Sequence, residues 1–245
     1  MSWHTSRLTG FDLESTGTNP EIDRIVTACV VDCDGGQPTT TGTWLSDVDG
    51  VEIPQEATRV HRVTTERAHA NGQPAAKVIQ EVVYALADAA EAGHPVVIMN
   101  APYDLTMLDR EARRHGITPL TDAVGGQLRV IDPRVLDKRI DPFRAGRRTL
   151  TDLCAHYKVR LDGAHTADAD AIAACRVAQR IGQQQPELAA LSVDELHARQ
   201  TTWAAEQARD LRAYFARTPN KQHRAAGVRE DWPLIPFKET ADVRP

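Results

Sequence analysis

The sequence predicts a mixed α/β fold, in which a central mixed sheet has an antiparallel N-terminal meander and helices on both faces. Two observations carry this prediction. Runs of β-branched residues separated by turn formers fill the first part of the chain, and after residue 74 segments with helical spacing alternate with short apolar runs. The chain has 245 residues, of which 41% are hydrophobic and 26% charged, and this composition suits one main core.

Three strands are expected to form the meander. Residues 7–14 alternate in polarity and stop at a cluster of turn formers, and residues 22–32 contain a run rich in β-branched side chains. A third, short strand is expected at residues 41–45, where it would complete an antiparallel arrangement. The segment around His61, which follows the meander, is predicted to be a loop.

Strands and helices then alternate. Residues 96–99 form a wholly apolar run, which is typical of a strand buried on both faces, and residues 127–131 are expected to form another strand. Helical spacing predicts helices at residues 74–92, 103–115, 149–157 and 167–181, with Gly116 at the end of the second.

The composition shifts beyond Pro186. Residues 192–217 have the pattern of a long amphipathic helix, and the tail after it has too many prolines for a helix. We therefore expect a main domain at residues 1–185 and a C-terminal segment, residues 186–245, that packs on it.

The bulk composition limits the class of protein. No apolar run approaches the length of a membrane span and no signal-like segment opens the chain, so we expect a cytoplasmic protein. The four cysteines contain no Cys-x-x-Cys pair, which favours buried free thiols. The formal net charge of −5 argues against a binder that relies on a broad basic surface, and it suits an enzyme whose carboxylates hold cations.

Acidic residues mark the candidate site. Asp12 and Glu14 lie two apart in an expected strand, so both side chains leave the same face of the sheet. Asp104 follows the apolar strand 96–99, at the strand end where ligands gather in open α/β sheets. Each signal has an ordinary explanation as well, because an exposed strand edge tolerates acids and the first turn of a helix favours them.

A third group of residues stands at the entry to the helix at 167–181. His165 precedes this helix, and Asp170 lies just past its first turn. A histidine on a flexible segment is suited to accept a proton from water, although a single loop histidine usually has no such role.

The three groups together resemble a known family. The sequence Phe11-Asp-Leu-Glu-Ser-Thr-Gly17 resembles the first motif of the DEDD exonucleases, Asn100-Ala-Pro-Tyr-Asp-Leu-Thr-Met-Leu108 the second, and His165-x-Ala-x-x-Asp-Ala171 the third. The His-to-Asp offset of five residues is that of the histidine type, the DnaQ-like DEDDh 3′→5′ exonucleases. This class includes the proofreading epsilon subunit of bacterial DNA polymerase III, ribonuclease T and oligoribonuclease. The resemblance spans residues 7–182.

The resemblance implies a ribonuclease H-like fold and two divalent cations, Mg²⁺ or Mn²⁺, at the site. Asp12 would bridge the two cations, Glu14 and Asp170 would complete the site that carries the attacking water, and Asp104 would help to hold the second cation. His165 would be the general base, and nucleoside 5′-monophosphates would be released.

The resemblance also implies substrate contacts. Leu13, Thr16 and Asn100 lie within the motifs, and His61 lies in a segment similar to one beside the terminal nucleotide, although Arg62 replaces the usual glycine there. The expected substrate is the 3′ end of a nucleic acid, with DNA favoured over RNA and single-stranded or frayed ends preferred. A DNA polymerase partner and a proofreading or repair role are compatible with the resemblance.

Several alternatives stay open from the sequence. An RNA-directed 3′→5′ exonuclease would have the same motifs, and so would a catalytically silent nucleic-acid-binding module of the same fold. The acids could also form a structural cation site. Arg144, Arg147 and Arg148 either follow a nucleic-acid backbone or are solvated loop charges. The sequence does not decide between a monomer and a dimer.

Overall fold

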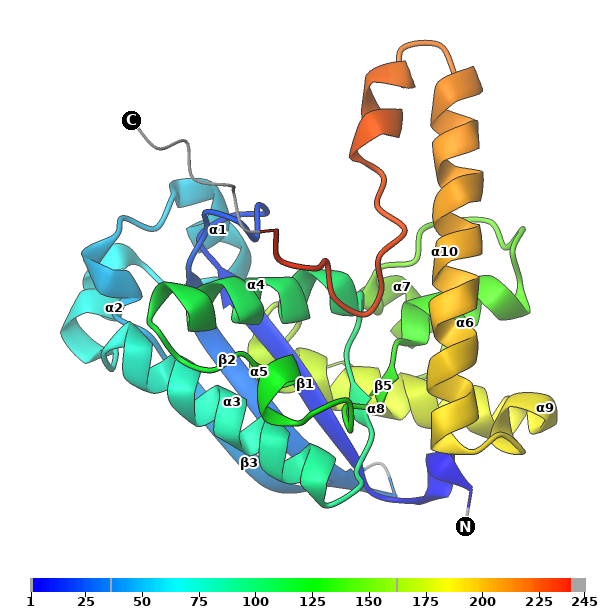
Figure 1. Ribbon diagram of the computed structural model, residues 1–245, viewed down its shortest axis with the longest axis horizontal. Helices are drawn as coiled ribbons and strands as arrows, with labels where there is room; N and C mark the ends of the chain where they lie inside the picture. The colour runs from blue at the N-terminus through cyan, green and yellow to red at the C-terminus, as the bar shows by residue number, and fades with distance from the viewer. Residues whose placement is uncertain (1, 36, 162, 239–245) are drawn as a thin grey trace.

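A five-stranded mixed sheet forms the centre of the protein in a computed structural model, which describes residues 2–35, 37–161 and 163–238 (Figure 1). The strand order is β3-β2-β1-β4-β5. Strands β1 (Leu8–Ser15), β2 (Ile25–Asp34) and β3 (Gln37–Leu45) pair antiparallel, whereas β4 (Val96–Val97) and β5 (Val130–Ile131) run parallel to β1. The predicted mixed sheet with its N-terminal meander is confirmed.

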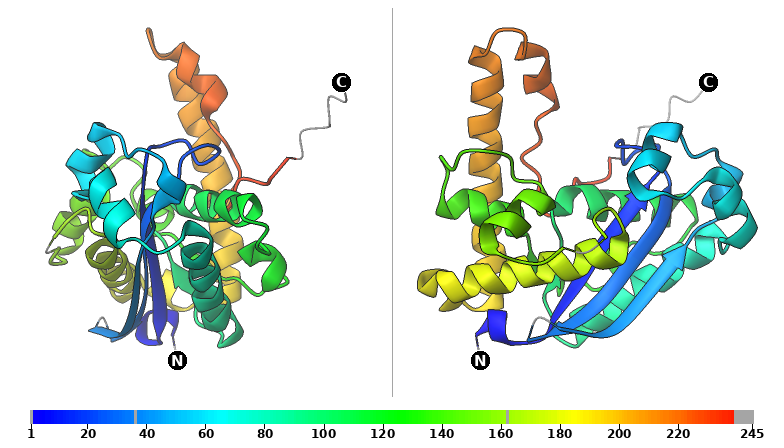
Figure 2. Two further views of the ribbon diagram at one scale, coloured as in Figure 1. Left: turned by 90° about the vertical axis from the view of Figure 1, so that its left-hand side faces the viewer. Right: turned by 180° about the vertical axis from the view of Figure 1, so that it is seen from behind.

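Helices cover both faces of this sheet. The edge-on view in Figure 2 shows the sheet between α8 on one side and α3 with α4 on the other. The principal helices are α3 (Ala75–Glu91), α4 (Ala101–Arg114), α6 (Pro133–Ile140), α7 (Leu150–Tyr157), α8 (Ala167–Gln184) and α10 (Val193–Arg217). Shorter helical segments are α1 (Gln55–His61), α2 (Thr65–Asn71), α5 (Leu120–Ala123), α9 (Pro186–Ala189), and the 3-10 helices at Trp3–Thr5, Val48–Gly50 and η3 (Gln222–Gly227).

Two helical regions differ from the expectations. The segment around His61 was expected to be a loop, but it forms α1 and α2, and the Thr64 side chain caps α2 by accepting from the backbone N–H of Arg67. The chain after the last strand forms α6, which begins with Asp132 as its N-cap and Pro133 in its first turn. That pair is a regular start signal for a helix, which the sequence interpretation did not use.

The close approach of α8 to β1 depends on Gly10. A Cβ atom at this position would lie 2.7 Å from the Ala171 carbonyl oxygen and 2.9 Å from the Cys175 Sγ atom. The missing side chain therefore lets the first turns of α8 lie directly on the strand. Because side chains alternate along a strand, Asp12 and Glu14 leave β1 on the same face as Gly10. They consequently face α8.

Side chains of α10 cover the edge of the sheet at β5. The Val130 backbone N–H donates to Nδ1 of His197 at 3.0 Å, and the Val130 carbonyl accepts from Nε2 of Gln200, also at 3.0 Å. The Asp132 backbone N–H donates to Oε1 of the same glutamine at 2.8 Å. Two helical side chains thus satisfy backbone groups that a neighbouring strand would otherwise pair.

The segment after α10 returns to the body of the molecule. Trp232 is buried, its ring lies 5.1 Å from that of His197, and its Nε1 donates to Asp132 at 3.4 Å. All four cysteines are free and buried, as expected. Within the described residues, no helix is both long enough and apolar enough to span a membrane.

Candidate active site

Strand β1 carries the first two acids of the site. Asp12 pairs in register with Cys29 of β2, and Glu14 pairs with Thr27. Both carboxylates are half-buried, whereas Leu13 between them is buried on the opposite face. The strand therefore presents its acids beneath the start of α8 and keeps its apolar side chains in the core.

Asp104 comes from the first turn of α4 and is only 4% exposed. The chain reaches this helix from β4 through Asn100, which has a left-handed conformation with φ 68°. Burial raises the pKa of Asp104 well above its usual value, and Asp132 and Glu14 add to the rise, while the backbone amides of Asp104 and Leu13 oppose it. Asp104 thus interacts electrostatically with the acids of β1, Asp12 and Glu14.

The buried side chain of Asp132 fixes the start of α4. Its carboxylate accepts hydrogen bonds from the backbone N–H groups of Asn100 at 3.1 Å, Ala101 at 3.0 Å and Arg134 at 2.9 Å. These bonds satisfy donors at the beginnings of both α4 and α6. Asp132 consequently has a structural role, and it positions Asp104 indirectly.

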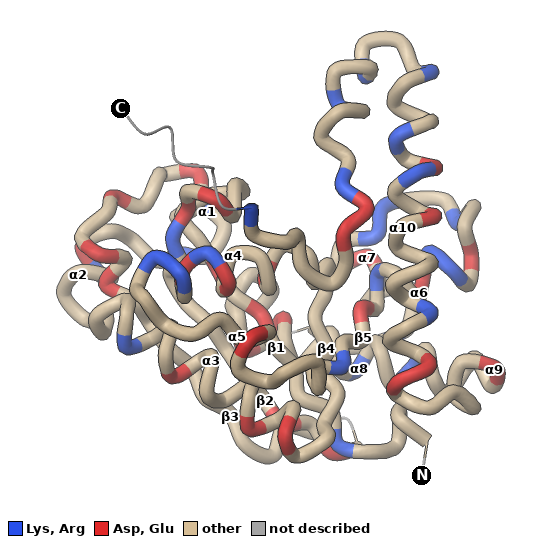
Figure 3. Tube along the Cα trace, in the orientation of Figure 1, with Lys and Arg blue, Asp and Glu red and all other residues tan. Residues whose placement is uncertain are grey.

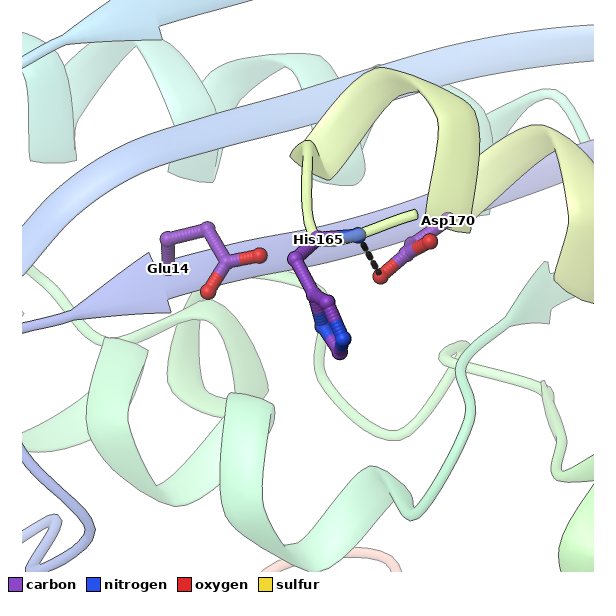
Figure 4. Close-up of side chains that lie close together, drawn as sticks. All are labelled: Glu14, His165 and Asp170. Carbon is purple, nitrogen blue, oxygen red and sulfur yellow. Dashed lines mark hydrogen bonds between the residues drawn. The ribbon is translucent and has the colours of Figure 1, made fainter. Parts of the chain in front are cut away.

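Asp170 and His165 lie at the entry to α8, as Figure 4 shows. The backbone N–H of His165 donates to Oδ2 of Asp170 at 3.3 Å, and the His165 side chain is exposed. The His165 backbone is left-handed, with φ 68°. The other carboxylate oxygen of Asp170, Oδ1, is buried and has no hydrogen-bond partner among the described residues. A buried oxygen of this kind is costly unless it meets a proton or a cation.

The side chains of Glu14, His165 and Asp170 converge, although they come from a strand, a loop and a helix. Each offers one ligand atom, and these three atoms all lie within 4.8 Å of one another. The sequence-predicted residues of the first and third motifs are therefore brought together in space (Figure 4).

The acids raise each other's pKa values. Burial is the main cause of the strongly raised pKa of Asp12, followed by the charges of Asp104, Asp170 and Glu14. Burial and the Asp170 charge raise the pKa of Glu14 to about 7. Burial also raises the pKa of Asp170. Such mutual repulsion is relieved when cations lie among the carboxylates, and the unpartnered Oδ1 of Asp170 offers a free ligand atom. The donor set therefore fits divalent cations.

The four expected substrate residues have different environments. Leu13 and Thr16 are buried, and the Thr16 hydroxyl accepts from the Arg24 backbone N–H at 2.9 Å. His61 is also buried, and burial lowers its pKa. A hydrogen bond with the backbone of Ser15 opposes this shift, which places His61 beside the end of β1. Asn100 is partly exposed, and its side-chain oxygen accepts from Arg134.

Tyr103 is a residue of this region to which the sequence interpretation assigned no role. Its hydroxyl hydrogen-bonds with the Ser15 hydroxyl and donates to the Gly17 carbonyl at 2.6 Å. Burial raises its pKa to about 12. Tyr103 therefore ties the start of α4 to the turn after β1. The sequence signal for this role was a tyrosine hydroxyl one residue before the expected ligand Asp104.

Two of the three loop arginines, Arg144 and Arg148, have internal partners. Arg144 and Arg148 both donate to Oδ2 of the buried Asp137, at 2.9 and 2.7 Å. Tyr157 donates to the other oxygen of that carboxylate at 3.0 Å. Arg144 and Arg148 consequently anchor the 141–149 loop.

Four carboxylates and a histidine at one end of a mixed sheet are suited to hold divalent cations against a phosphodiester. A family model described as Exonuclease, that of the RNase T family, matches residues 9–178. The chain belongs to this exonuclease family, which confirms the DnaQ-like DEDD resemblance and the class of hydrolases acting on phosphodiester bonds. No curated protein matches the chain.

Solved structures of exonuclease I have a similar fold. Escherichia coli exonuclease I in complex with a dT13 oligonucleotide is 17% identical with a TM-score of 0.62, covering 75% of this chain and 42% of that one. Exonuclease I from Methylocaldum szegediense is 19% identical with a TM-score of 0.61, covering 86% and 46%. The present chain thus spans less than half the length of these structures.

Proposed function

We propose that this protein is a 3′→5′ exonuclease that removes nucleoside 5′-monophosphates from the 3′ ends of DNA, with single-stranded or frayed ends preferred. The convergence of Glu14, His165 and Asp170 carries the proposal, because three separate parts of the chain place ligand atoms within 4.8 Å of one another. The raised pKa values of Asp12 and Asp104 extend this group to four carboxylates.

The four carboxylates are suited to hold two divalent cations, Mg²⁺ or Mn²⁺, which would neutralise the phosphate and make a water molecule more acidic. Asp12 lies among the other three acids, and this position suits a shared ligand. Glu14 and Asp170 would hold the cation on the side of His165, and Asp104 would help to hold the other.

His165 would accept the proton of the attacking water. Its exposed ring stands beside Glu14 and Asp170, and the bond from its backbone to Asp170 fixes the loop that carries it. A neutral imidazole is a suitable acceptor near neutral pH. His61 and the turn at Ser15 lie beside the same end of β1, where Thr16, Asn100 and the backbone of Leu13 would help to shape the site for the terminal nucleotide.

No residue of this group reads the identity of a base, so digestion independent of sequence is expected. Single-stranded DNA is the favoured substrate because exonuclease I, whose fold is similar, has been solved with DNA oligonucleotides. Proofreading beside a polymerase and DNA repair are both roles that this chemistry would serve.

A time course on 5′-labelled single-stranded DNA with Mg²⁺, Mn²⁺ or EDTA tests the proposal. A descending ladder that requires a divalent cation is expected, with mononucleotides as products. A matched RNA oligonucleotide in the same assay tests the choice of strand, and a strong preference for RNA would overturn it. A wild-type protein that binds oligonucleotides but releases no mononucleotide with any cation would instead be a silent binding module.

We also propose that residues 186–245 complete the exonuclease fold and are not a separate domain. The hydrogen bonds of His197 and Gln200 to β5, and the burial of Trp232, support this proposal.

A further inference from the structure

A hollow of about 310 Å³ lies at the other end of β1 from the acids. Its lining includes Gly35 beyond β2, Lys158 beyond α7, and Gln179 on α8. Because Cys33 of β2 pairs with Leu8, the first residue of β1, Gly35 lies near the start of that strand. Along α8, Gln179 is nine residues beyond Asp170, which corresponds to about 14 Å. The hollow is therefore separate from the candidate active site.

The charge of this hollow contrasts with that of the whole chain. Among residues 2–35, 37–161 and 163–238, its lining includes Lys158, Arg160, Arg176 and Arg180 and no Asp or Glu, whereas the chain has a formal net charge of −5. Arginine and lysine side chains have donors and no acceptor. A lining of this composition is complementary to an anion with several oxygens.

The buried side chain of Gln179 provides a second, independent observation. This residue is only 5% exposed and lines the hollow, and its Nε2 atom has no hydrogen-bond partner in the part of the chain that the structure describes. A buried amide donor without a partner is destabilising, and native proteins rarely keep one without a reason. An anion in the hollow would accept this hydrogen bond.

We propose that this hollow is a binding site for a phosphate group, belonging either to a free nucleotide or to a nucleic-acid backbone. Its volume is at the lower end of the range for small-molecule sites and suits one nucleotide-sized ligand. The proposal does not depend on hydrolysis at the acids of β1.

Binding measurements in EDTA test the site, because they do not require the hydrolytic reaction. The probes are inorganic phosphate, thymidine 5′-monophosphate and an oligothymidylate of about 15 nucleotides. Wild-type protein is expected to bind inorganic phosphate, and the double variant Lys158→Gln/Arg180→Gln is expected to bind it at least about 10-fold more weakly. Lys77→Gln/Arg199→Gln, which removes the same charge from exposed positions elsewhere, is the control.

Gln179→Leu separates a binding role from a structural one. Replacing an unsatisfied buried amide with an apolar side chain is expected to leave the ligand-free Tm unchanged or higher, and yet to weaken phosphate binding. Tighter binding of the mononucleotide than of phosphate or the oligonucleotide identifies a nucleotide site, and tightest binding of the oligonucleotide identifies a backbone site. Equal binding by wild type and both pocket variants, or no phosphate binding by wild type, overturns the proposal.

A second observation concerns the far end of α10. Figures 1 and 2 show that the outer part of α10 projects from the body with η3 alongside, and we call residues 211–229 the arm. The arm contains five Lys and Arg residues and no Asp or Glu. The rest of the chain therefore has 24 Lys and Arg residues against 34 Asp and Glu residues. Figure 3 shows the basic residues along this projection.

The cations of the arm divide into two groups. Arg212 and Arg229 pair with Glu230 and Asp231 at its base. The cations nearer the tip are Arg217, Lys221 and Arg224. They have no carboxylate partner among residues 2–35, 37–161 and 163–238. Tyr214 beside them is 48% exposed and lies under Lys221. Cations without a carboxylate partner, together with a half-exposed aromatic ring, suit a single-stranded nucleic acid.

We infer that the arm binds the phosphate backbone of the substrate strand away from its 3′ end, an inference that rests on the proposed function. The triple variant Arg217→Gln/Lys221→Gln/Arg224→Gln is expected to bind an oligothymidylate of about 15 nucleotides more weakly. The slope of log affinity against log salt should fall by about 2, since each lost phosphate contact removes about 0.7.

Hydrolysis of the small substrate thymidine 5′-(p-nitrophenyl) phosphate should not change, because this substrate is too short to reach the arm. Arg7→Gln/Lys77→Gln/Arg199→Gln, which removes three exposed cations elsewhere, is the matched control. An unchanged salt slope in the arm variant overturns the inference. A different result would contradict the proposed function itself: the wild-type protein would hydrolyse neither the oligonucleotide nor the small substrate.

Discussion

The backbone N–H of His165 donates to Oδ2 of Asp170 at 3.3 Å, so the expected base and one expected ligand share a single hydrogen bond. Oδ1 of Asp170 remains free to meet a cation. The loop before α8 and its first turns thus present the expected proton acceptor and the expected metal ligand as one unit.

His165→Ala should lower kcat by about 10²- to 10⁴-fold, because it removes a proton acceptor and leaves the carboxylates in place. The exposed ring makes few packing contacts, so Tm should change little. Stopped-flow or gel assays of mononucleotide release, together with a Mg²⁺ titration of Tm, measure both effects. Retention of full activity would remove His165 from the mechanism.

Asp12→Asn should abolish mononucleotide release while raising the metal-free Tm. The substitution removes the charge that Asp104, Asp170 and Glu14 repel, but it also removes the proposed shared metal ligand. Thermal unfolding in EDTA and in Mg²⁺ should therefore show a more stable protein that gains less from the cation. A lower Tm in EDTA would contradict the electrostatic account.

The metal-free protein should lose stability as the pH rises. The pKa of Glu14 is raised to about 7 in the folded state, so the folded protein binds more protons than the unfolded chain between the ordinary carboxyl pKa and about 7. The contribution of Glu14 to stability therefore falls across that interval and levels off above it. Tm measured in EDTA should drop by a few degrees between about pH 5 and about pH 8.

Glu14→Gln should flatten this pH profile, since the variant has no carboxyl group at that position to titrate. Adding Mg²⁺ to the wild type should restore Tm mainly at the high-pH end, where the carboxylates are charged and bind cations. A metal-free Tm that rises between about pH 5 and about pH 8 is the opposite of the expected sign.

Asp132→Ala should destabilise the protein by about 2–4 kcal/mol, because it leaves the backbone donors of Asn100, Ala101 and Arg134 without their partner. Urea unfolding measures this loss. Activity at a temperature where the variant is folded should fall much less than for Asp12→Asn, since Asp132 positions the start of α4 and is not among the expected metal ligands. Loss of activity equal to that of Asp12→Asn at full folding would place Asp132 in the site itself.

Local sequence patterns predicted those parts of the fold whose causes are local. The alternation in β1 placed Asp12 and Glu14 on one face, and the helical spacing of α3 and α8 identified both helices. Short helices were less visible: α1 and α2 have only 7 residues each, too few for a periodic signal. The site could be predicted as a set of residues, but its electrostatics could not, because the pKa of Glu14 depends on burial and on Asp170.

Contacts between distant segments were beyond the reach of local patterns. Nothing in the spacing of Gln200 indicates that its amide binds both Val130 and Asp132, since the three residues meet only after the sheet and α10 have packed. Glutamine in an amphipathic helix ordinarily faces solvent, whereas Gln200 is fully buried.

Gln200→Leu should cost about 1–3 kcal/mol, because the Asp132 backbone N–H and the Val130 carbonyl lose their partner in the core. Truncation after residue 185 should do more, giving a chain that aggregates or unfolds well below the Tm of the whole protein. Urea unfolding and size-exclusion chromatography check these outcomes. A truncated chain that is monomeric and fully active would show that residues 186–245 form an independent segment.

The capping of β5 by α10 also sets an order of events during synthesis. A nascent chain that has emerged only as far as α8 contains all five expected site residues, yet the backbone groups of Val130 are still unpaired. Because Asp132, whose backbone N–H donates to Gln200, in turn holds the start of α4, the final placement of Asp104 waits for α10. A ribosome-bound fragment should therefore acquire its nuclease activity only when α10 has left the exit tunnel.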